Sequence, residues 1–440
     1  MENSYTYKDK VVSVETAIER VKTDDVIVTG LGPAEGRLFL SNLHKVADKV
    51  KNVTVTNCLP MVPYDFMEVD YVDSFKVDGW FFTPELRRLY KNGNISYIPN
   101  HLHLAALDRL DHKKTNIYVG SATAVDKHGF VSLSTSNTYE RRMIDAADLV
   151  IIEVNDKYPR TYGDVELHVN DIDIIIEADY EVPELPSITP NEKDRTIAKY
   201  IADLVNDGDT IQLGIGGIPN AVAEFLMDKK DLGVHTEMMT SNMAKLAKAG
   251  VITGKKKTLH KNKMVATFIM GNQALYDFCD DNTSILILDG NYVNDPKVIA
   301  QNDNMVSINT SIEVDLMGQC ASESIGTRQI SGTGGQSDTA VGARDAKNGR
   351  SFIALYSTAM IRDKESGERV EVSKIVATLN LGAIVSLSRN DVDNVVTEYG
   401  VAHLRGTNTK ERVERLIAIA HPKFREQLYA DARRFGLYND

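Results

Sequence analysis

Residues 210–219, T-I-Q-L-G-I-G-G-I-P, and residues 232–239, L-G-V-H-T-E-M-M, decide the fold of this 440-residue chain. Each begins as a short apolar strand. The first runs into a glycine turn before the helix-like spacing of Ala221–Leu226, and the second ends in the carboxylate of Glu237. A glycine turn at a helix N-terminus offers N–H groups to an anion, and a carboxylate that ends a parallel strand faces the ligand crevice of an open α/β sheet. The plainer interpretation is that the glycines only make a turn and that Glu237 caps the next helix.

The same pattern occurs earlier in the chain, because residues 17–32 align without gaps on residues 201–216. The matched pairs are Asp25 with Asp209, Gly30 with Gly214, and Gly32 with Gly216. With a small gap, Val53–Asn57 takes the place of Gly233–Glu237, so the first copy has an amide where the second has a carboxylate. The period is too long for a solenoid and predicts a duplicated domain. Chance similarity between two helix–strand–turn units is the alternative.

Strand-like and helix-like segments alternate along the chain, which is typical of an α/β fold. Predicted strands include residues 25–29, 53–56, 79–82, 95–98, 116–119 and 149–154, and helices are expected at 14–22 and 409–420. The proline-bearing stretch 182–190 is the best candidate for a linker. We therefore predict an N-terminal domain over residues 1–185 and a C-terminal domain over 186–440 that carries Glu237.

Composition excludes several classes of protein. The net charge of −12 argues against a general nucleic-acid surface, so an anionic cofactor would need a local basic patch. The densest candidate is Lys255–Lys257 with Lys261 and Lys263, although such runs usually form a solvated face. The polar first residues and the lack of a long apolar run predict no secretion signal and no membrane span. Three widely spaced cysteines, Cys58, Cys279 and Cys320, predict a reduced cytoplasmic protein without a metal site.

A second glycine-rich loop, Ser331–Asp338, lies in the same predicted domain as Gly214. Glycines let a backbone approach a ligand closely. A tight surface turn is the alternative. His403 stands alone among apolar neighbours and is more often structural than catalytic in such a setting. The sequence contains no Ser-His-Asp order and no metal-ligand spacing.

Four motifs together resemble the acetyl-CoA hydrolase/transferase family. They are G-I-G-G-I-P at 214–219, H-T-E at 235–237, S-G-T-G-G-Q-S-D at 331–338 and T-E-Y-G-V-A-H-L-R-G at 397–406. Within the family the chain is most similar to 4-hydroxybutyrate CoA-transferases and butyryl-CoA:acetate CoA-transferases, over almost its whole length. The resemblance implies two tandem open α/β domains of the CoA-transferase (NagB/RpiA-like) fold with an active site at their interface. It also implies a homodimer or a dimer of dimers.

The resemblance further implies that Glu237 is a nucleophile that forms a glutamyl-CoA thioester in a ping-pong reaction. The implied CoA-contacting residues are Gly214, Ile215, Gly216, Gly217, Ile218, Ser331, Gly334 and Gly335. Coenzyme A or acyl-CoA and small carboxylic acids are then substrates, with neither a metal nor a nicotinamide cofactor.

Two departures from the family pattern affect the expected substrate. Where many relatives continue the second loop with D-F, this chain has Asp338-Thr339-Ala340, which predicts an acyl pocket that is roomier or filled from elsewhere. The alternative is that these side chains point away from the pocket. Met360 stands where some relatives have a lysine that contacts CoA. Three other functions stay open: an acyl-CoA hydrolase of the same fold, a nicotinamide-dependent oxidoreductase, and a non-catalytic sensor of CoA or a metabolite. The oxidoreductase fits poorly, because the glycines do not match G-x-G-x-x-G.

Overall fold

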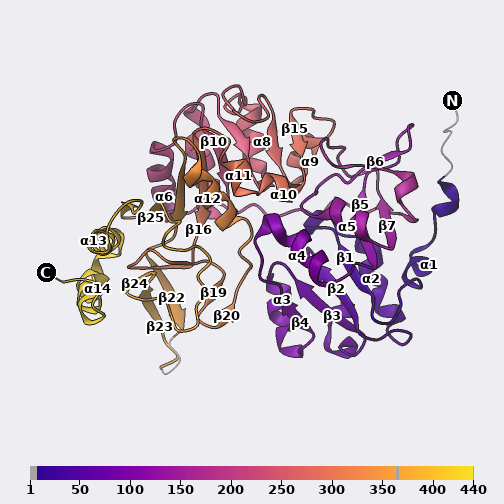
Figure 1. Ribbon diagram of the computed structural model, residues 1–440, viewed down its shortest axis with the longest axis horizontal. Coiled ribbons are helices and arrows are strands. Elements are labelled where there is room, and N and C mark those ends of the chain that lie inside the picture. The colour runs from indigo at the N-terminus through magenta and orange to yellow at the C-terminus, as the bar shows by residue number, and fades with distance from the viewer. Residues whose placement is uncertain (1–6, 363–365, 440) are drawn as a thin grey trace. The chain divides into compact units, whose positions relative to one another are not determined.

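A computed structural model describes residues 7–362 and 366–439. The chain forms two compact units. The first unit consists of Met1–Ser187, Thr236–Ala244 and Lys263–Asn294. The second unit consists of Ile188–His235, Lys245–Asn262 and Asp295–Asp440. Each unit is built around a largely parallel sheet covered by helices, so the predicted α/β fold class is confirmed (Figure 1).

The first unit contains a seven-stranded parallel sheet with the order β4-β3-β2-β1-β5-β7-β9. Its strands are β1 (Val26–Thr29), β2 (Val53–Asn57), β3 (Phe75–Gly79), β4 (Ile95–Tyr97), β5 (Ile117–Ala122), β7 (Leu149–Val154) and β9 (Ile174–Glu177). The helices between them are α1 (Val14–Ile18), α2 (Arg37–Asn42), α3 (Pro84–Leu89), α4 (Ala105–His112) and α5 (Glu140–Ala146). Later segments add β12 (Met238–Met239), β13 (Met264–Ala266), β14 (Phe268–Ile269), α9 (Gln273–Cys279), β15 (Ile285–Ile287) and α10 (Gly290–Val293).

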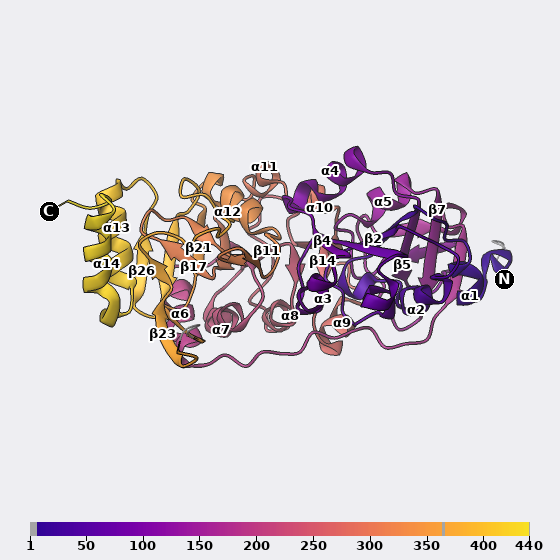
Figure 2. The same ribbon diagram turned by 90° about the horizontal axis from the view of Figure 1, so that it is seen from below.

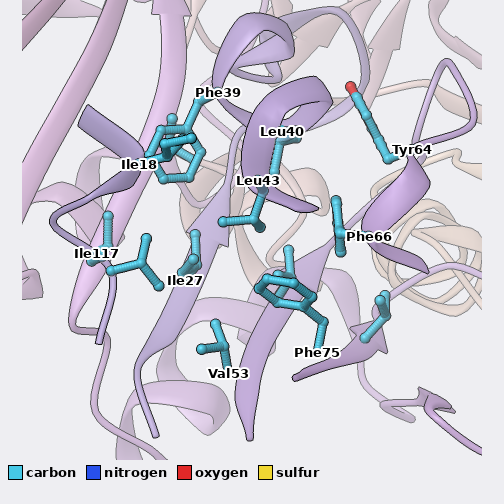
Figure 3. Close-up of a cluster of buried hydrophobic side chains, with 14 of the residues drawn as sticks. Ile18, Ile27, Phe39, Leu40, Leu43, Val53, Tyr64, Phe66, Phe75 and Ile117 are labelled. Carbon is cyan, nitrogen blue, oxygen red and sulfur yellow. The ribbon is translucent and has the colours of Figure 1, made fainter. Parts of the chain in front are cut away.

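Apolar side chains on one face of this sheet pack against the covering helices. Ile27, Val53 and Phe75 come from three adjacent strands, and Leu40 and Leu43 come from α2 and the turn after it (Figure 3). All five side chains are buried. Strands β1 and β2 are buried along their whole length, as expected of parallel strands covered on both faces. This agrees with the apolar sequence of β1 (V-I-V-T), whereas β2 (V-T-V-T-N) buries threonine side chains as well.

The second unit repeats this architecture with neighbouring strands in the order β11-β10-β16-β21-β25-β26. These strands are β10 (Thr210–Leu213), β11 (Gly233–His235), β16 (Met305–Thr310), β21 (Arg350–Ala354), β25 (Asn394–Thr397) and β26 (Gly400–His403). All pair in parallel except β26, which is antiparallel to β25. The helices are α6 (Glu192–Asp203), α7 (Gly217–Phe225), α11 (Pro296–Ile299), α12 (Gln336–Asp345), α13 (Thr409–Ile419) and α14 (Pro422–Arg434). Helix α8 (Ser241–Lys248) begins in the first unit and ends in the second.

The predicted duplication is confirmed by topology and by detail. Strand β1 lies between β2 and β5, and β10 lies between β11 and β16, so the matched segments are central strands. Before each of them an aspartate accepts a hydrogen bond from the backbone three residues earlier, Asp25 from Lys22 (2.8 Å) and Asp209 from Asn206 (2.6 Å). After each of them a glycine N–H donates to a carbonyl of the neighbouring strand in the sheet, Gly30 to β5 (3.1 Å) and Gly214 to β16 (2.9 Å).

Smaller sheets and a helical pair complete the second unit. They are β18-β17-β24 (Cys320–Ala321, Glu313–Asp315, Ile375–Val376), β19-β20 (Ser324–Ile325, Arg328–Gln329) and β22-β23 (Thr358–Arg362, Arg369–Ser373). The first unit has one further antiparallel pair, β6-β8 (Phe130–Ser132, Glu166–His168). Helices α13 and α14 lie side by side near the C-terminus (Figure 2).

One local prediction was wrong in an informative way. The strand expected at 79–82 is β3 at Phe75–Gly79, and the aromatic residues after it, Trp80 and Phe82, are buried in the turn that follows. Lys257, in the basic run considered for anion binding, is buried, and its ammonium donates to the carbonyl of Val234 (2.6 Å). Among the described residues, no helix is both long enough and apolar enough to cross a bilayer.

Candidate active site

Glu237 lies in the first unit, in the short bend between β11 and β12, and is partly exposed. Its backbone carbonyl accepts hydrogen bonds from the N–H groups of Thr267 (2.9 Å) and Phe268 (3.1 Å). These bonds fix the backbone from which the carboxylate projects. The bend therefore presents an acidic side chain from a rigid support.

Asn294 supplies a hydrogen-bond donor to this carboxylate. Its side-chain amide Nδ2 donates to Oε2 of Glu237 at 3.1 Å. Asn294 is fully buried at the C-cap of α10, and its own N–H bonds to the carbonyl of Gly290 (3.0 Å). This contact could not be predicted from the sequence, because the two residues are 57 positions apart and no motif links them.

The charge of Glu237 affects the pKa of a buried thiol, Cys58. Burial raises the pKa of Cys58 well above its ordinary value, and nearby carboxylates raise the pKa further. In decreasing order of effect these carboxylates are Glu237, Glu140 and Glu35. Cys58 is therefore a neutral thiol at physiological pH and a poor nucleophile.

Glu35 holds together the loop that follows β2. Its Oε1 accepts from Nδ2 of Asn57 (2.6 Å), and its Oε2 accepts from the hydroxyl of Tyr64 (3.0 Å) and the N–H of Met61 (3.2 Å). Complete burial raises the pKa of Glu35 to about 8, although these hydrogen bonds oppose the shift. One carboxyl group therefore anchors three points of residues 57–64, the loop that contains Cys58.

Glu140 does the same for the turn after β1. Its two oxygens accept from the N–H groups of Leu31 (2.8 Å) and Tyr139 (2.9 Å), and burial raises its pKa. Gly32, in the same turn with φ +54°, donates its N–H to the carbonyl of Cys58 (3.1 Å). Two buried glutamates thus brace two turns that are also bonded to each other.

The three glycines of the first glycine turn differ in conformation and in the space around them. A Cβ on Gly217 would lie 2.5 Å from a carboxylate oxygen of Asp194, so the start of α7 packs directly against α6. Gly214 fits closely against the carbonyl of the neighbouring β16 strand. Gly216 adopts φ +126° with open space beside it, and the Ile215 side chain is 46% exposed. Only the Gly216 position therefore has both the conformation and the room for a ligand to approach the backbone. Ile218 is buried.

The second glycine loop is anchored by Glu323, which the sequence did not single out. Its carboxylate accepts from the hydroxyl of Thr333 (2.5 Å), and its backbone carbonyl accepts from the N–H of Ser331 (3.1 Å). Gly334 has φ +56°, and Gly335 is the N-cap of α12. The loop therefore runs from a buried acidic anchor to the start of a helix.

The structure brings the two glycine segments together within the second unit. The first follows β10 and the second leads into α12, whose Gln336 donates from Nε2 to the carbonyl of Thr310 (2.7 Å). Since Thr310 ends β16, both segments lie at the carboxyl ends of adjacent parallel strands. This is the edge where open α/β sheets bind ligands. Glu237 and Asn294 both belong to the first unit.

The Thr339 and Ala340 side chains are buried inside the second unit, so the predicted widening of an acyl pocket at these positions is wrong. The Thr339 hydroxyl bonds to the hydroxyl of Ser307 (3.0 Å) and to Nδ2 of Asn309 (3.1 Å). Ala340 belongs to a hydrophobic core cluster. Helix α12 turns both residues inward against β16. Met360 is exposed on β22.

Across residues 7–362 and 366–439, no group of three or more His, Cys, Asp and Glu side chains has an arrangement that fits a metal ion.

Family models match both ends of the chain. Residues 1–186 match the acetyl-CoA hydrolase/transferase N-terminal domain, and residues 271–432 match the acetyl-CoA hydrolase/transferase C-terminal domain. The two matches lie in order along the sequence and together cover most of it. The resemblance inferred from the motifs is thereby confirmed.

Individual relatives match over almost their full length. The 4-hydroxybutyrate coenzyme A transferase of Clostridium kluyveri is 40% identical over 99% of this chain and 100% of its own. The butyryl-CoA:acetate CoA-transferase of Anaerostipes caccae is 35% identical over 98% of each chain. The crystal structure of RipA from Yersinia pestis superposes with a TM-score of 0.92 at 32% identity and covers 100% of both chains. Acetyl-CoA hydrolases of three yeasts match at only 25–27% identity.

Proposed function

This chain belongs to the acetyl-CoA hydrolase/transferase family and is a CoA-transferase, and from that premise we propose that Glu237 carries the CoA as a covalent thioester. The observation that carries the proposal is the contact between Glu237 and Asn294. One oxygen of a partly exposed carboxylate has a buried amide donor at 3.1 Å. The hydrogen bond orients the carboxylate, and an ordinary carboxylate needs no base to activate it as a nucleophile, since it is ionised at neutral pH.

The proposed reaction exchanges two acyl groups on one thiol. One Glu237 oxygen attacks the carbonyl of the acyl-CoA, and the C–S bond breaks to give a mixed anhydride and CoA thiolate. The thiolate then attacks the glutamyl carbonyl, which forms the enzyme thioester and releases the first acid as its carboxylate. The acceptor carboxylate reverses these steps and leaves as a new acyl-CoA. Two covalent half-reactions of this kind give ping-pong kinetics.

Asn294 fits the charge that develops during the second step. When the thiolate attacks the glutamyl carbonyl, the oxygen that is not bonded to the acyl group becomes an oxyanion. A donor already aimed at Oε2 stabilises this oxyanion without reorganisation, and one such donor contributes about 2.7–4 kcal/mol. The amide therefore supplies electrostatic stabilisation as well as orientation.

We assign CoA contact to the two glycine segments, with Gly216 as the residue whose backbone has room for the ligand. Binding energy from the nucleotide end of CoA, remote from the reacting carbon, lowers the barrier at the thioester. The names of the relatives support 4-hydroxybutyrate or butyrate, exchanged with acetate, as the acids. A cytoplasmic location, a homodimer and the domain boundary after residue 185 stay predictions.

Acyl-CoA hydrolysis is the second candidate, because acetyl-CoA hydrolases share the family. Water would then take the place of the acceptor acid at the same thioester. Release of free CoA from acetyl-CoA, measured with and without added butyrate, separates the two activities. A transferase forms butyryl-CoA and releases little free CoA, whereas a hydrolase releases CoA at a rate that butyrate does not change.

Mass spectrometry of the trapped intermediate tests the nucleophile. The enzyme is incubated with butyryl-CoA and no acceptor, reduced with borohydride and digested. We expect CoA or the reduced residue on the peptide that contains Glu237, and Glu237→Ala abolishes both the adduct and transfer. An adduct on Glu323 or Glu398 instead overturns the assignment.

A further inference from the structure

Helix α10 is too short to position Asn294 by itself. It spans only Gly290–Val293, and isolated helices of this length are not stable in water. Its N-cap is Asp289, whose side chain accepts from the N–H of Asn291 (2.7 Å). What holds this turn in place therefore determines where Asn294 meets Glu237.

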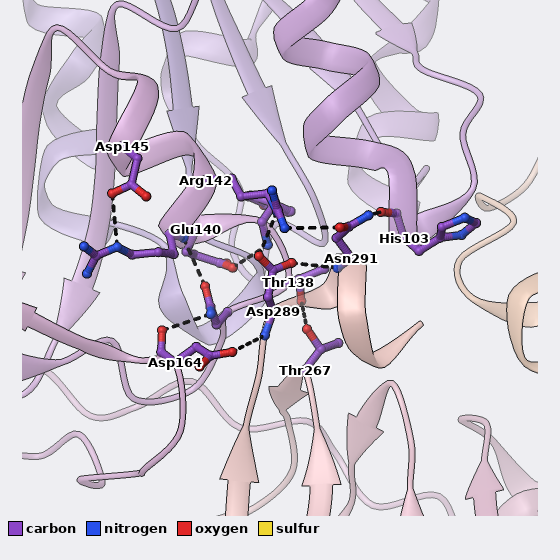
Figure 4. A network of polar contacts seen from close by, with 12 residues as sticks. His103, Thr138, Glu140, Arg142, Asp145, Asp164, Thr267, Asp289 and Asn291 are labelled. Atoms are coloured by element: carbon purple, nitrogen blue, oxygen red, sulfur yellow. Dashed lines mark hydrogen bonds and ion pairs between the residues drawn. The ribbon is translucent and has the colours of Figure 1, made fainter. Parts of the chain in front are cut away.

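One arginine binds both polar side chains at the start of α10 (Figure 4). Arg142, on α5, forms an ion pair through Nε with Oδ2 of Asp289 (2.7 Å). Its Nη2 also donates to Oδ1 of Asn291 (3.1 Å). The other end of the Asn291 amide donates to the carbonyl of His103 (2.8 Å). The planar guanidinium thus contacts Asp289 and Asn291 at the same time, which the compact ammonium of a lysine would do less well.

The local charges make Arg142 hard to replace. The Asp289 side chain is only 17% exposed, and its backbone N–H donates to Oδ2 of Asp164 (3.2 Å). Burial is the main cause that raises the pKa of Asp289, Asp164 raises it further, and Arg142 lowers it. Without the arginine, two carboxylates would face each other at the start of α10.

The residues just before α5 contact the other side of the same site. Asn137 donates its N–H to the carbonyl of Thr267 (2.9 Å) and accepts at its own carbonyl from the N–H of Gly290 (3.1 Å). The hydroxyls of Thr267 and Thr138 also bond, at 3.4 Å. Since the Thr267 N–H holds the carbonyl of Glu237, Asn137 and Arg142 together are bonded to both sides of the Glu237–Asn294 contact.

We infer that Arg142 is a positioning residue for the transfer reaction: through Asp289 and Asn291 it sets α10, and thereby places the Asn294 amide on Glu237. This inference rests on the proposed role of Glu237. Arg142 touches neither reacting atom and acts only through Asn294. Its loss should therefore lower kcat and leave the KM for acyl-CoA unchanged.

The test compares Arg142→Gln with Arg141→Gln. Arg141 is the adjacent residue on α5, but it pairs with Asp145 (3.1 Å) and bonds to the carbonyl of Glu166 (3.2 Å), away from α10. We expect Arg142→Gln to lower kcat about 100-fold, the loss that a misplacement near 1 Å causes. Arg141→Gln should keep the wild-type kcat. If the Arg142 variant fails to fold, Asn291→Ala removes the same contact while the ion pair stays, and it should lower kcat in the same way.

A double-mutant cycle with Asn294→Ala separates this inference from the function on which it rests. When two substitutions act through the same contact, their effects on the activation free energy do not add. Arg142→Gln should therefore lower kcat no further in an enzyme that already carries Asn294→Ala. Multiplicative losses, or a wild-type kcat in Arg142→Gln, overturn the inference. If Asn294→Ala itself keeps the wild-type kcat, the inference fails together with the proposed role of Asn294. If the adduct is absent from Glu237, the proposed function fails instead.

Discussion

Replacement of Asn294 by alanine is the most direct perturbation of the proposed chemistry. The change removes the amide Nδ2 that donates to Oε2 of Glu237. It breaks no other side-chain hydrogen bond within the described part of the chain, since Oδ1 of Asn294 has no hydrogen-bond partner there. The backbone N–H that caps α10 is retained. The variant should therefore fold and bind acyl-CoA while it loses a transition-state contact.

The size of the effect follows from the geometry. The distance of 3.1 Å is within hydrogen-bonding range, and the oxygen concerned is the one that becomes the oxyanion. Removal of one such donor costs about 2.7–4 kcal/mol, which corresponds to a loss of roughly 10²–10³ in kcat. In the proposed reaction both half-reactions pass through the same glutamyl intermediate. Both should therefore slow together, whichever acyl-CoA is the donor.

Steady-state transfer from butyryl-CoA to acetate measures kcat and KM, and borohydride trapping reports the thioester. Asn302→Ala is a matched control, because Asn302 is also a fully buried asparagine, and its side-chain amide donates to the carbonyl of Ile299 (3.5 Å) and not to Glu237. It should keep the wild-type kcat. An Asn294→Ala enzyme that folds and keeps more than about a third of kcat would refute the oxyanion role, because one lost donor is expected to remove far more.

Two other variants test the supports of the site. The pKa of Glu35 is 4.5 in the unfolded chain and about 8 in the folded protein, because burial favours its neutral form. Its stabilising contribution is therefore complete below pH 4.5 and falls by roughly 5 kcal/mol as the pH rises from 4.5 to about 8. Urea unfolding at pH 5 and pH 8 should show this fall in the wild type relative to Glu35→Gln, and an equal pH dependence of the two proteins would contradict the buried-acid interpretation. Gly217→Ala should lower the free energy of unfolding by about 1–3 kcal/mol, because its Cβ would overlap Asp194, and an additional Asp194→Ala substitution should recover part of the loss. An unchanged unfolding midpoint in Gly217→Ala would contradict this prediction, because it would mean that α6 and α7 move apart at little cost in free energy.

Local sequence predicted the fold well where the pattern itself is local. Strands 149–154 and 210–213 were predicted with their observed bounds. The first is an almost continuous apolar run, which is typical of a covered parallel strand, and the second ends at a glycine turn. The strand β3 was missed, because its alternating F-K-V-D pattern is weaker than the aromatic run that follows it. Those aromatic side chains pack into the core from a turn, which hydrophobicity alone cannot distinguish from a strand.

The site was predictable only as far as motifs reach. Glu237 was singled out because it ends a strand and lies in a recognisable motif. Asn294, Glu35 and Arg142 look like ordinary surface residues in the sequence, since neither their burial nor their partners leave a local pattern. Thr339 shows the opposite error: a difference from relatives beside a glycine loop suggested a pocket, but the helical phase of α12 turns the side chain toward β16.

The division of the chain into units has a consequence for the gene. The polypeptide passes from one unit to the other five times, after Ser187, His235, Ala244, Asn262 and Asn294. A gene split at the codon for Ser187 would encode two similar halves, as the duplication suggests. The reading frame of the second half would nevertheless encode Glu237 and Asn294, which fold into the body encoded largely by the first. A split after Ser187 would therefore place Glu237 and Asn294 on one chain and Asn137 and Arg142, which are bonded to the segments around their contact, on the other. The fused gene keeps the synthesis and stoichiometry of these parts linked.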